Sequence, residues 1–154
     1  MILSAQSIRR RQMVEPFHER TVAHGMTFGV GPAGYDVRIA EDLLLFPQAF
    51  MLASTMERFL IPDDVLGFAM DKSTWARRGL SLFNTVLEAG WSGHLTLELT
   101  NHSSEALLIR SGMPIAQIVF HRLDEPTEQP YPATGKYQGQ PARPVPAILE
   151  PDHV

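Results

Sequence analysis

The residues best suited to chemistry lie within 71–101, a strand-like stretch that combines cations with one mid-strand carboxylate. Polar and apolar residues alternate along 94–101, which is typical of a half-buried strand, and Glu98 falls on the polar face. Three cations precede it in the sequence: Lys72, Arg77 and Arg78. Such cations could bind a polyphosphate while the carboxylate transfers a proton. Taken alone, however, a glutamate in this position is more often a solvated surface residue.

The composition excludes several kinds of site. The sequence has no cysteine, which excludes disulfides, thiol nucleophiles and the His/Cys/Cys zinc site of the zinc nucleobase deaminases. Its six histidines show no close metal-ligand spacing such as HExxH. The formal net charge of −4 argues against a nucleic-acid partner, so any anion site must be a local cationic pocket.

The bulk composition is that of an ordinary globular domain. The chain has 154 residues, of which 44% are hydrophobic and 19% are charged. No apolar run approaches the length of a membrane span, and the short apolar start is followed by arginines at 9–11, the wrong order for a secretory signal. We therefore expect a cytoplasmic protein with no membrane partner.

Hydrophobic periodicity predicts the elements that must position these residues. Residues 1–15 are the best helix candidate, because Ser4 can act as the N-cap and apolar residues follow at loose helical spacing. Residues 16–34 are expected to form a loop or an irregular strand. Short strands are expected at 34–39, 50–55, 65–70, 82–88, 94–101, 106–109 and 114–121, with a helical turn within 74–80. This pattern predicts a mostly β fold, a barrel or a sandwich, with one N-terminal helix.

The chain from Leu123 onward has a different composition. It shows little apolar patterning and holds seven of the twelve prolines, at positions 126, 130, 132, 141, 144, 146 and 151. We expect an extended arm that is disordered or lies on another surface. A small barrel with a long Pro-rich arm suggests an oligomer in which the arm crosses to a neighbour.

Several motifs follow one another over nearly the whole chain. GYDVR stands at 34–38, KSTWARRGL at 72–80, GWSGHLTLELTN at 90–101, GMPIAQ at 112–117 and KYQGQ at 136–140. Each motif alone is a weak signal. Together and in this order they give a chain that resembles the dCTP deaminase and dUTPase superfamily, and the dCTP deaminase branch most closely.

The resemblance implies a distorted, dUTPase-like β-barrel over residues 1–125, followed by a C-terminal arm or lid over residues 126–154. It also implies a homotrimer with active sites between subunits and a deoxypyrimidine triphosphate as the substrate. The implied reaction is the zinc-independent deamination of dCTP to dUTP, with further conversion to dUMP in the bifunctional type.

The resemblance also assigns roles to individual residues. Glu98 would be the general acid–base that moves protons between a water molecule and the cytosine ring. Ser73 and Arg77 would position the base and polarise the reacting groups. The triphosphate and lid residues would be Lys72, Thr74, Tyr131, Lys136 and Gln140, with Mg²⁺ bound by the phosphates. Thr96 and Gln117 would line the base or sugar pocket.

The segment at 81–90 departs from the family pattern. It is shorter than in most deaminases, and Glu88 replaces the aspartate that in dUTPases holds the sugar 3′-hydroxyl and helps to activate water. Asp71 stands where a glycine is usual. Two alternatives to dCTP deamination therefore stay open. One is a dUTP diphosphatase that releases pyrophosphate, with Glu88 catalytic, and the other is a catalytically altered member that binds nucleotide without turnover.

Overall fold

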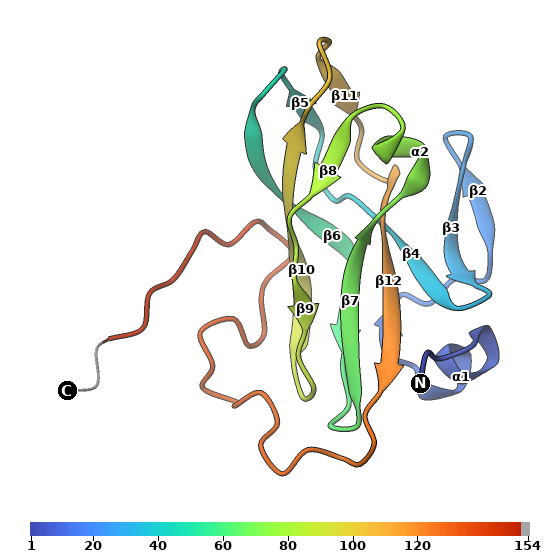
Figure 1. Ribbon diagram of the computed structural model, residues 1–154, viewed down its shortest axis with the longest axis vertical. Helices are drawn as coiled ribbons and strands as arrows, with labels where there is room; N and C mark the ends of the chain where they lie inside the picture. Colours follow the sequence, from blue (N-terminus) through green and yellow to red (C-terminus); the bar gives the residue numbers. More distant parts are fainter. Residues whose placement is uncertain (152–154) are drawn as a thin grey trace.

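The computed structural model describes residues 1–151 and is mostly β, as predicted (Figure 1). Its helices within this range are α1 (Ala5–Arg11) and α2 (Ser73–Ala76). Its strands are β1 (Val14–Glu15), β2 (Thr21–Ala23), β3 (Met26–Gly31), β4 (Gly34–Arg38), β5 (Leu43–Leu45), β6 (Phe50–Leu60), β7 (Val65–Asp71), β8 (Leu80–Leu82), β9 (Val86–Leu87), β10 (Ser92–Asn101), β11 (Leu107–Ile109) and β12 (Pro114–Arg122). Antiparallel pairing orders them as β2-β3-β4-β12-β7-β9, as β1-β6-β10-β8 and as the pair β11-β5.

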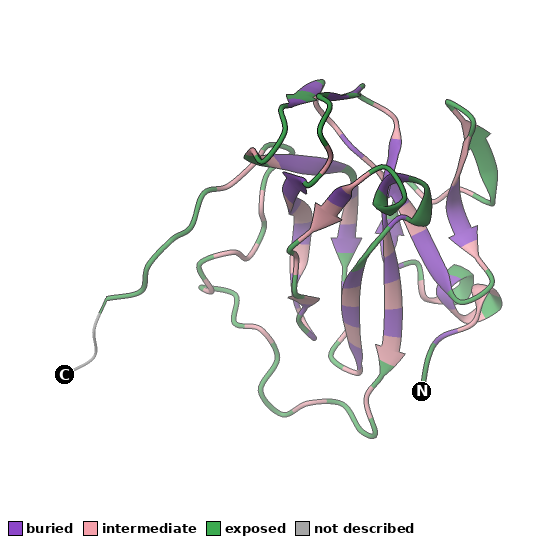
Figure 2. Cartoon of the chain, turned by 45° about the horizontal axis from the view of Figure 1, so that its top comes forward, coloured by how far each residue is buried: buried purple, intermediate pink, exposed green. Residues whose placement is uncertain are grey.

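The two larger sheets bury their inner faces in one apolar core. Phe59 of β6 and Leu97 of β10 are fully buried, and so are Tyr35 of β4 and Phe120 of β12. Figure 2 shows buried residues along these strands, whereas the chain that follows β12 is mostly exposed or half-buried. Among residues 1–151, no helix has the length and apolar character needed to cross a membrane.

The N-terminal helix is shorter than predicted. We predicted a helix over residues 1–15, but α1 ends before Gln12, which takes a left-handed conformation with a φ of 50°. The reason is tertiary packing: Met13 and Val14 are buried in the core, and Val14 pairs with Phe59 of β6. Core burial of these two side chains thus overrides the local helical pattern.

Two other segments differ from the sequence prediction. Residues 16–34, expected to form a loop or an irregular strand, contain the hairpin of β2 and β3. The strand expected at 82–88 is split into β8 and β9, because the chain leaves the sheet at residues 83–85. The split between β8 and β9 lies beside β10, the strand that carries Glu98.

The predicted alternation along β10 holds over most of the strand. Leu97 and Leu99 are fully buried, as expected. Leu95 is half-buried: it packs against the core and also lines a cavity, next to a register shift in the pairing of β10 with β6 between His94 and Thr96.

The last arginine of α1 makes an ion pair that should be visible in the pH dependence of stability. The Arg11 guanidinium donates to both carboxylate oxygens of Asp64, each at 2.8 Å, and these bonds hold the pKa of Asp64 below its ordinary value. A carboxyl whose pKa is lower in the folded state stabilises the fold above its ordinary pKa and loses that contribution as the pH falls. We therefore expect Asp64→Asn to lower the free energy of unfolding by about 1 kcal/mol at neutral pH and by progressively less below about pH 4.

Urea unfolding of both proteins from about pH 3 to about pH 7 measures this difference. Asp63→Asn, at the exposed neighbouring position, is the matched control and is expected to behave like the wild type. A destabilisation by Asp64→Asn that stays constant across this range would contradict the ion-pair explanation.

Candidate active site

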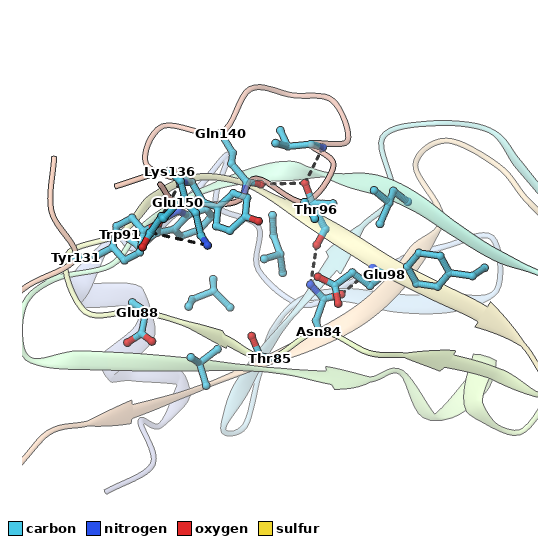
Figure 3. A pocket seen from close by; sticks show the side chains of 18 residues that line it. Asn84, Thr85, Glu88, Trp91, Thr96, Glu98, Tyr131, Lys136, Gln140 and Glu150 are labelled. Carbon is cyan, nitrogen blue, oxygen red and sulfur yellow. Dashed lines mark hydrogen bonds and ion pairs between the residues drawn. The ribbon is translucent and has the colours of Figure 1, made fainter. Parts of the chain in front are cut away.

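Residues 126–151 form the arm that follows β12, and a cavity of about 610 Å³ lies between this arm, β9 and β10 (Figure 3). Six residues predicted to act in one site line it: Glu88, Thr96, Glu98, Tyr131, Lys136 and Gln140. Apolar side chains form much of the remaining wall, among them Leu52, Val86 and Leu95. The structure therefore brings the predicted general acid–base into the same space as the predicted arm residues.

Glu98 projects from β10 into this cavity and is half-buried. Burial raises the pKa of its carboxyl, because the surrounding protein removes water from the charged form. Its backbone is held on one side, where its N–H donates to Asn84 Oδ1 (2.9 Å) and its carbonyl accepts from the Phe83 N–H (2.9 Å). A carboxyl with a raised pKa can both take up and release a proton, as general acid–base catalysis requires.

The arm pairs with the start of β10 through main-chain bonds. The Gly139 N–H donates to Ser92 O (2.8 Å). The His94 N–H in turn donates to Gln140 O (2.9 Å), and Gln140 forms a parallel bridge with Gly93. Glycine is required at position 93, because its φ is 143° and a Cβ there would lie 2.6 Å from Gln140 N. The arm therefore approaches β10 more closely than a side chain at position 93 would allow.

Side chains of the arm form the polar part of the cavity. Gln140 Oε1 accepts from the Thr96 hydroxyl (2.9 Å), and the same hydroxyl oxygen accepts from the Val145 N–H (3.0 Å). Lys136 Nζ lies 3.9 Å from Glu150 Oε1, at the edge of ion-pair distance. The arm thus supplies both an amide and an ammonium group to the lining.

Other predicted residues line a second cavity of about 290 Å³ beside β3, β4, β7 and β12. Lys72, Ser73 and Gln117 belong to this group. The ammonium of Lys72 is buried and lies 2.6 Å from Asp36 Oδ2, while Gln117 Nε2 donates to Asp36 Oδ1 (3.2 Å). Asp36 is therefore the centre of this second group, with an ammonium and an amide on its two oxygens.

The remaining two predicted residues lie outside both linings. Thr74 in α2 and Arg77 just after it are exposed. Figure 1 shows α2 at the upper end of β7, and neither Thr74 nor Arg77 belongs to the lining that holds Glu98. In residues 1–151, no three histidine, aspartate or glutamate side chains gather as metal ligands.

The two residues that depart from the family pattern have separate positions. Glu88 is exposed at one end of the first cavity, and Figure 3 shows it apart from Glu98, with Thr85 between them. Asp71 is exposed at the end of β7, where its Oδ1 accepts from the Leu82 N–H (2.8 Å). The carboxylate of Asp71 therefore ties β7 to β8.

Asn84 and Tyr137 line the first cavity but were missed by the sequence analysis. Asn84 Nδ2 donates to Thr96 O (2.6 Å), and the Tyr137 hydroxyl accepts from the Ile148 N–H (3.0 Å). A polar amide within the apolar run was the available signal for Asn84, because asparagine favours breaks in strands. Tyr137 belongs to the KYQGQ motif, but only the position of the arm shows that its side chain lines the cavity.

Comparison with known proteins shows clear relatives in sequence. A family model described as dCTP deaminase-like matches residues 36–123, more than half of the chain. The dCTP deaminase of Thermococcus sibiricus is 36% identical over 154 residues, covering 90% of this chain and 92% of that protein. The dCTP deaminase of Campylobacter fetus subsp. fetus is 34% identical over 176 residues, covering 94% of each.

Solved structures share the fold at lower identity. The 2′-deoxycytidine 5′-triphosphate deaminase of Agrobacterium tumefaciens gives a TM-score of 0.62 at 18% identity, covering 77% of this chain and 46% of that one. The dUTPase of Staphylococcus bacteriophage 80alpha gives 0.58 at 20% identity, covering 75% of this chain and 89% of that one. These likenesses establish a dUTPase-like fold. With the family model and the identities above, they lead to the conclusion that this chain belongs to the dCTP deaminase-like family.

Proposed function

We propose that this protein converts dCTP and water into dUTP and ammonia. The observation that carries the proposal is the position of Glu98, a half-buried carboxyl with a raised pKa on the wall of a cavity of about 610 Å³. Cavities of roughly 300–1,000 Å³ are typical of small-molecule sites. Membership of the dCTP deaminase-like family supports the substrate, since the relatives at 36% and 34% identity are dCTP deaminases.

Glu98 would move both protons of the attacking water. It would take one proton as the water oxygen bonds to C4 of the cytosine ring, and pass it to ring N3. The tetrahedral C4 then bears a hydroxyl and an amino group. Glu98 would take the hydroxyl proton and pass it to the amino group, so that the C4–N bond breaks and ammonia leaves. The raised pKa of its carboxyl suits both directions of transfer.

Arm residues would hold the triphosphate. The contact of Lys136 with exposed Glu150 is long at 3.9 Å, so the ammonium can exchange this partner for a phosphate. Tyr131 and Gln140 would close the arm over the nucleotide and exclude water. The phosphates would carry Mg²⁺, which neutralises part of their charge, and zinc would take no part.

The cytoplasm stays the expected location of the protein.

Two copies of the chain would complete each site within a homotrimer. The group around Asp36 and the exposed Arg77 lie apart from the cavity that holds Glu98. If both groups contact one nucleotide, the second group has to come from a neighbouring copy. In a closed cyclic trimer each subunit would then supply Glu98 to one site and Arg77 to the next.

The product of dCTP turnover tests the proposed function directly. Incubation of the protein with dCTP and Mg²⁺ is expected to yield dUTP and ammonia in equal amounts, measured by nucleotide chromatography and an ammonia assay. Appearance of dUMP and pyrophosphate as well would extend the reaction to the bifunctional type. Binding of dCTP with no product would contradict the proposal and indicate a catalytically altered member.

A dUTP diphosphatase is the second candidate, favoured by one observation. Glu88 lines the same cavity as Glu98, and its exposed carboxylate could activate a water for attack on a phosphate. Pyrophosphate release from dUTP that is lost in Glu88→Gln would support this activity. No release from either nucleotide would exclude it.

A further inference from the structure

Main-chain pairing between β8 and β10 ends just before the cavity begins. Leu82 is the last residue of β8 paired with β10, opposite Leu99. The Phe83 N–H still donates to Glu98 O (2.9 Å), and the chain then turns away toward β9. Asn84 stands at this point of departure.

The side-chain amide of Asn84 continues the pairing in place of a strand. Its Nδ2 donates to Thr96 O (2.6 Å), and its Oδ1 accepts from the Glu98 N–H (2.9 Å). These two backbone groups belong to the peptides on either side of Leu97, whose side chain is fully buried. An amide side chain has the donor and the acceptor of a peptide group, so it can satisfy both positions of a β ladder. Figure 3 shows the amide beside the Glu98 side chain.

The Asn84 side chain thus bonds where a strand would otherwise pair, and this has two geometric consequences. Because both peptides around Leu97 are fixed, the side chains of Thr96 and Glu98 are held on the face that lines the cavity. Because no further strand is needed at this edge, the chain at 85–86 can run apart from β10. Thr85 and Val86 then line the opposite wall of the cavity.

We propose that Asn84 is a positioning residue for the deamination. Its amide keeps the Glu98 carboxyl turned into the cavity, and it covers the edge of β10 between Thr96 and Glu98 against water. The inference rests on the proposed function, in which Glu98 moves the protons. Asn84 acts through Glu98 and has no need to touch the nucleotide.

Several other ionisable groups face the cavity and form the background against which Glu98 titrates. They are Glu88, Tyr131, Lys136, Tyr137 and Glu150. On the other side of β10, strand β6 contributes Phe50 and Leu52 to the lining, neither of which titrates. Variants at position 84 leave all of these groups in place, so a change in the Glu98 titration arises from position 84, through the lost amide in Asn84→Ala and through the lost donor and added charge in Asn84→Asp.

Two substitutions at position 84 are expected to act in opposite directions on pH. Asn84→Ala removes both bonds, so kcat for dCTP should fall about 10- to 100-fold with a smaller change in KM, because the carboxyl is misplaced. Water then reaches Glu98, its pKa falls, and the acid limb of kcat/KM moves to lower pH. Asn84→Asp keeps the shape and the acceptor for the Glu98 N–H, loses the donor to Thr96 O, and adds a carboxylate next to Glu98, so the acid limb should move to higher pH.

Carboxyl-carbon NMR titration of Glu98, assigned with Glu98→Gln, reads the same shifts without turnover. Thr100→Val is the matched control, because it removes the bond from the Thr100 hydroxyl to Ala49 O (3.2 Å) on the same strand but outside the cavity lining. It is expected to leave the pH profile and the Glu98 titration unchanged.

The outcomes separate this inference from the proposed function. If the wild type deaminates dCTP but Glu98 titrates identically in the wild type and both Asn84 variants, the positioning role is overturned and the function stands. If the wild type forms no product, the function fails, and the titration alone shows whether Asn84 controls the surroundings of Glu98. Should Asn84→Ala fail to fold, Asn84→Asp carries the test, and an unshifted titration in that variant overturns the inference.

Discussion

Replacement of Glu98 by glutamine is expected to lower kcat for dCTP deamination by about 10²- to 10⁴-fold, the range that a placed general acid–base contributes. Glutamine keeps the length of the side chain, so the affinity for dCTP should change little. Product chromatography at saturating dCTP measures kcat, and calorimetric titration measures binding. Loss of kcat without loss of binding would identify Glu98 as a group that acts in the transition state.

The same substitution should stabilise the fold at neutral pH. Burial raises the pKa of Glu98 above its ordinary value of 4.5, so the folded state binds this proton more tightly than the unfolded state. The stabilisation from the protonated carboxyl is complete below the ordinary pKa and is lost as the pH rises through the raised value. Glutamine has no charge to bury, so the stability of Glu98→Gln relative to the wild type should increase from about pH 4 to about pH 7.

Thermal unfolding of the wild type and Glu98→Gln at about pH 4 and about pH 7 measures this gain in stability. Glu105→Gln is the control, because it makes the same substitution at an exposed position outside the cavity lining. It is expected to change neither kcat nor the pH dependence of stability. A kcat for Glu98→Gln close to that of the wild type would remove Glu98 from the mechanism.

Subunits that carry Glu98→Gln and subunits that carry Arg77→Ala are expected to be inactive separately and active together. If each site takes Glu98 from one subunit and Arg77 from the next, equal random mixing leaves about one site in four with both native residues. We therefore expect about 25% of the wild-type rate after the two variants are refolded together. Sites contained within one chain would give no recovery.

The control for this experiment is a mixture of Glu98→Gln with the double variant Glu98→Gln/Arg77→Ala. No site in that mixture holds Glu98, so the rate should stay at the level of the single variant. Sedimentation analysis of the same samples measures the mass of the assembly, which should be that of a trimer. A monomer that nevertheless shows recovery would contradict the shared-site explanation.

The strand that carries Glu98 could be predicted from the sequence because its signal is local. Period-two alternation depends on residues of the same strand, so Leu97 and Leu99 were placed in the core correctly. The bulge could not be predicted in this way. It depends on Thr55, whose hydroxyl accepts from the Leu95 N–H (2.9 Å) across 40 residues of sequence.

Other features depend on contacts that no local pattern encodes. The end of α1 is set by burial of Met13 and Val14 against β6, and the break after β8 is set by the bonds of Asn84 to β10. The burial of Lys72 depends on Asp36, 36 residues earlier. Residues of the arm had no periodicity to reveal them, so Lys136 was found through its motif alone.

The arrangement along the edge of β10 bears on how copies of this chain can associate. One edge of β10 pairs with β6. The other edge is covered, from the start of the strand to its end, first by the arm, then by the Asn84 amide and then by β8. The arm contributes the Gly139 N–H, the Gln140 carbonyl and the Gln138 side chain, whose Oε1 accepts from the Ser92 N–H. Every copy of the chain carries the same groups. An arm exchanged between two copies would therefore join them with the same bonds that close the cavity within one chain.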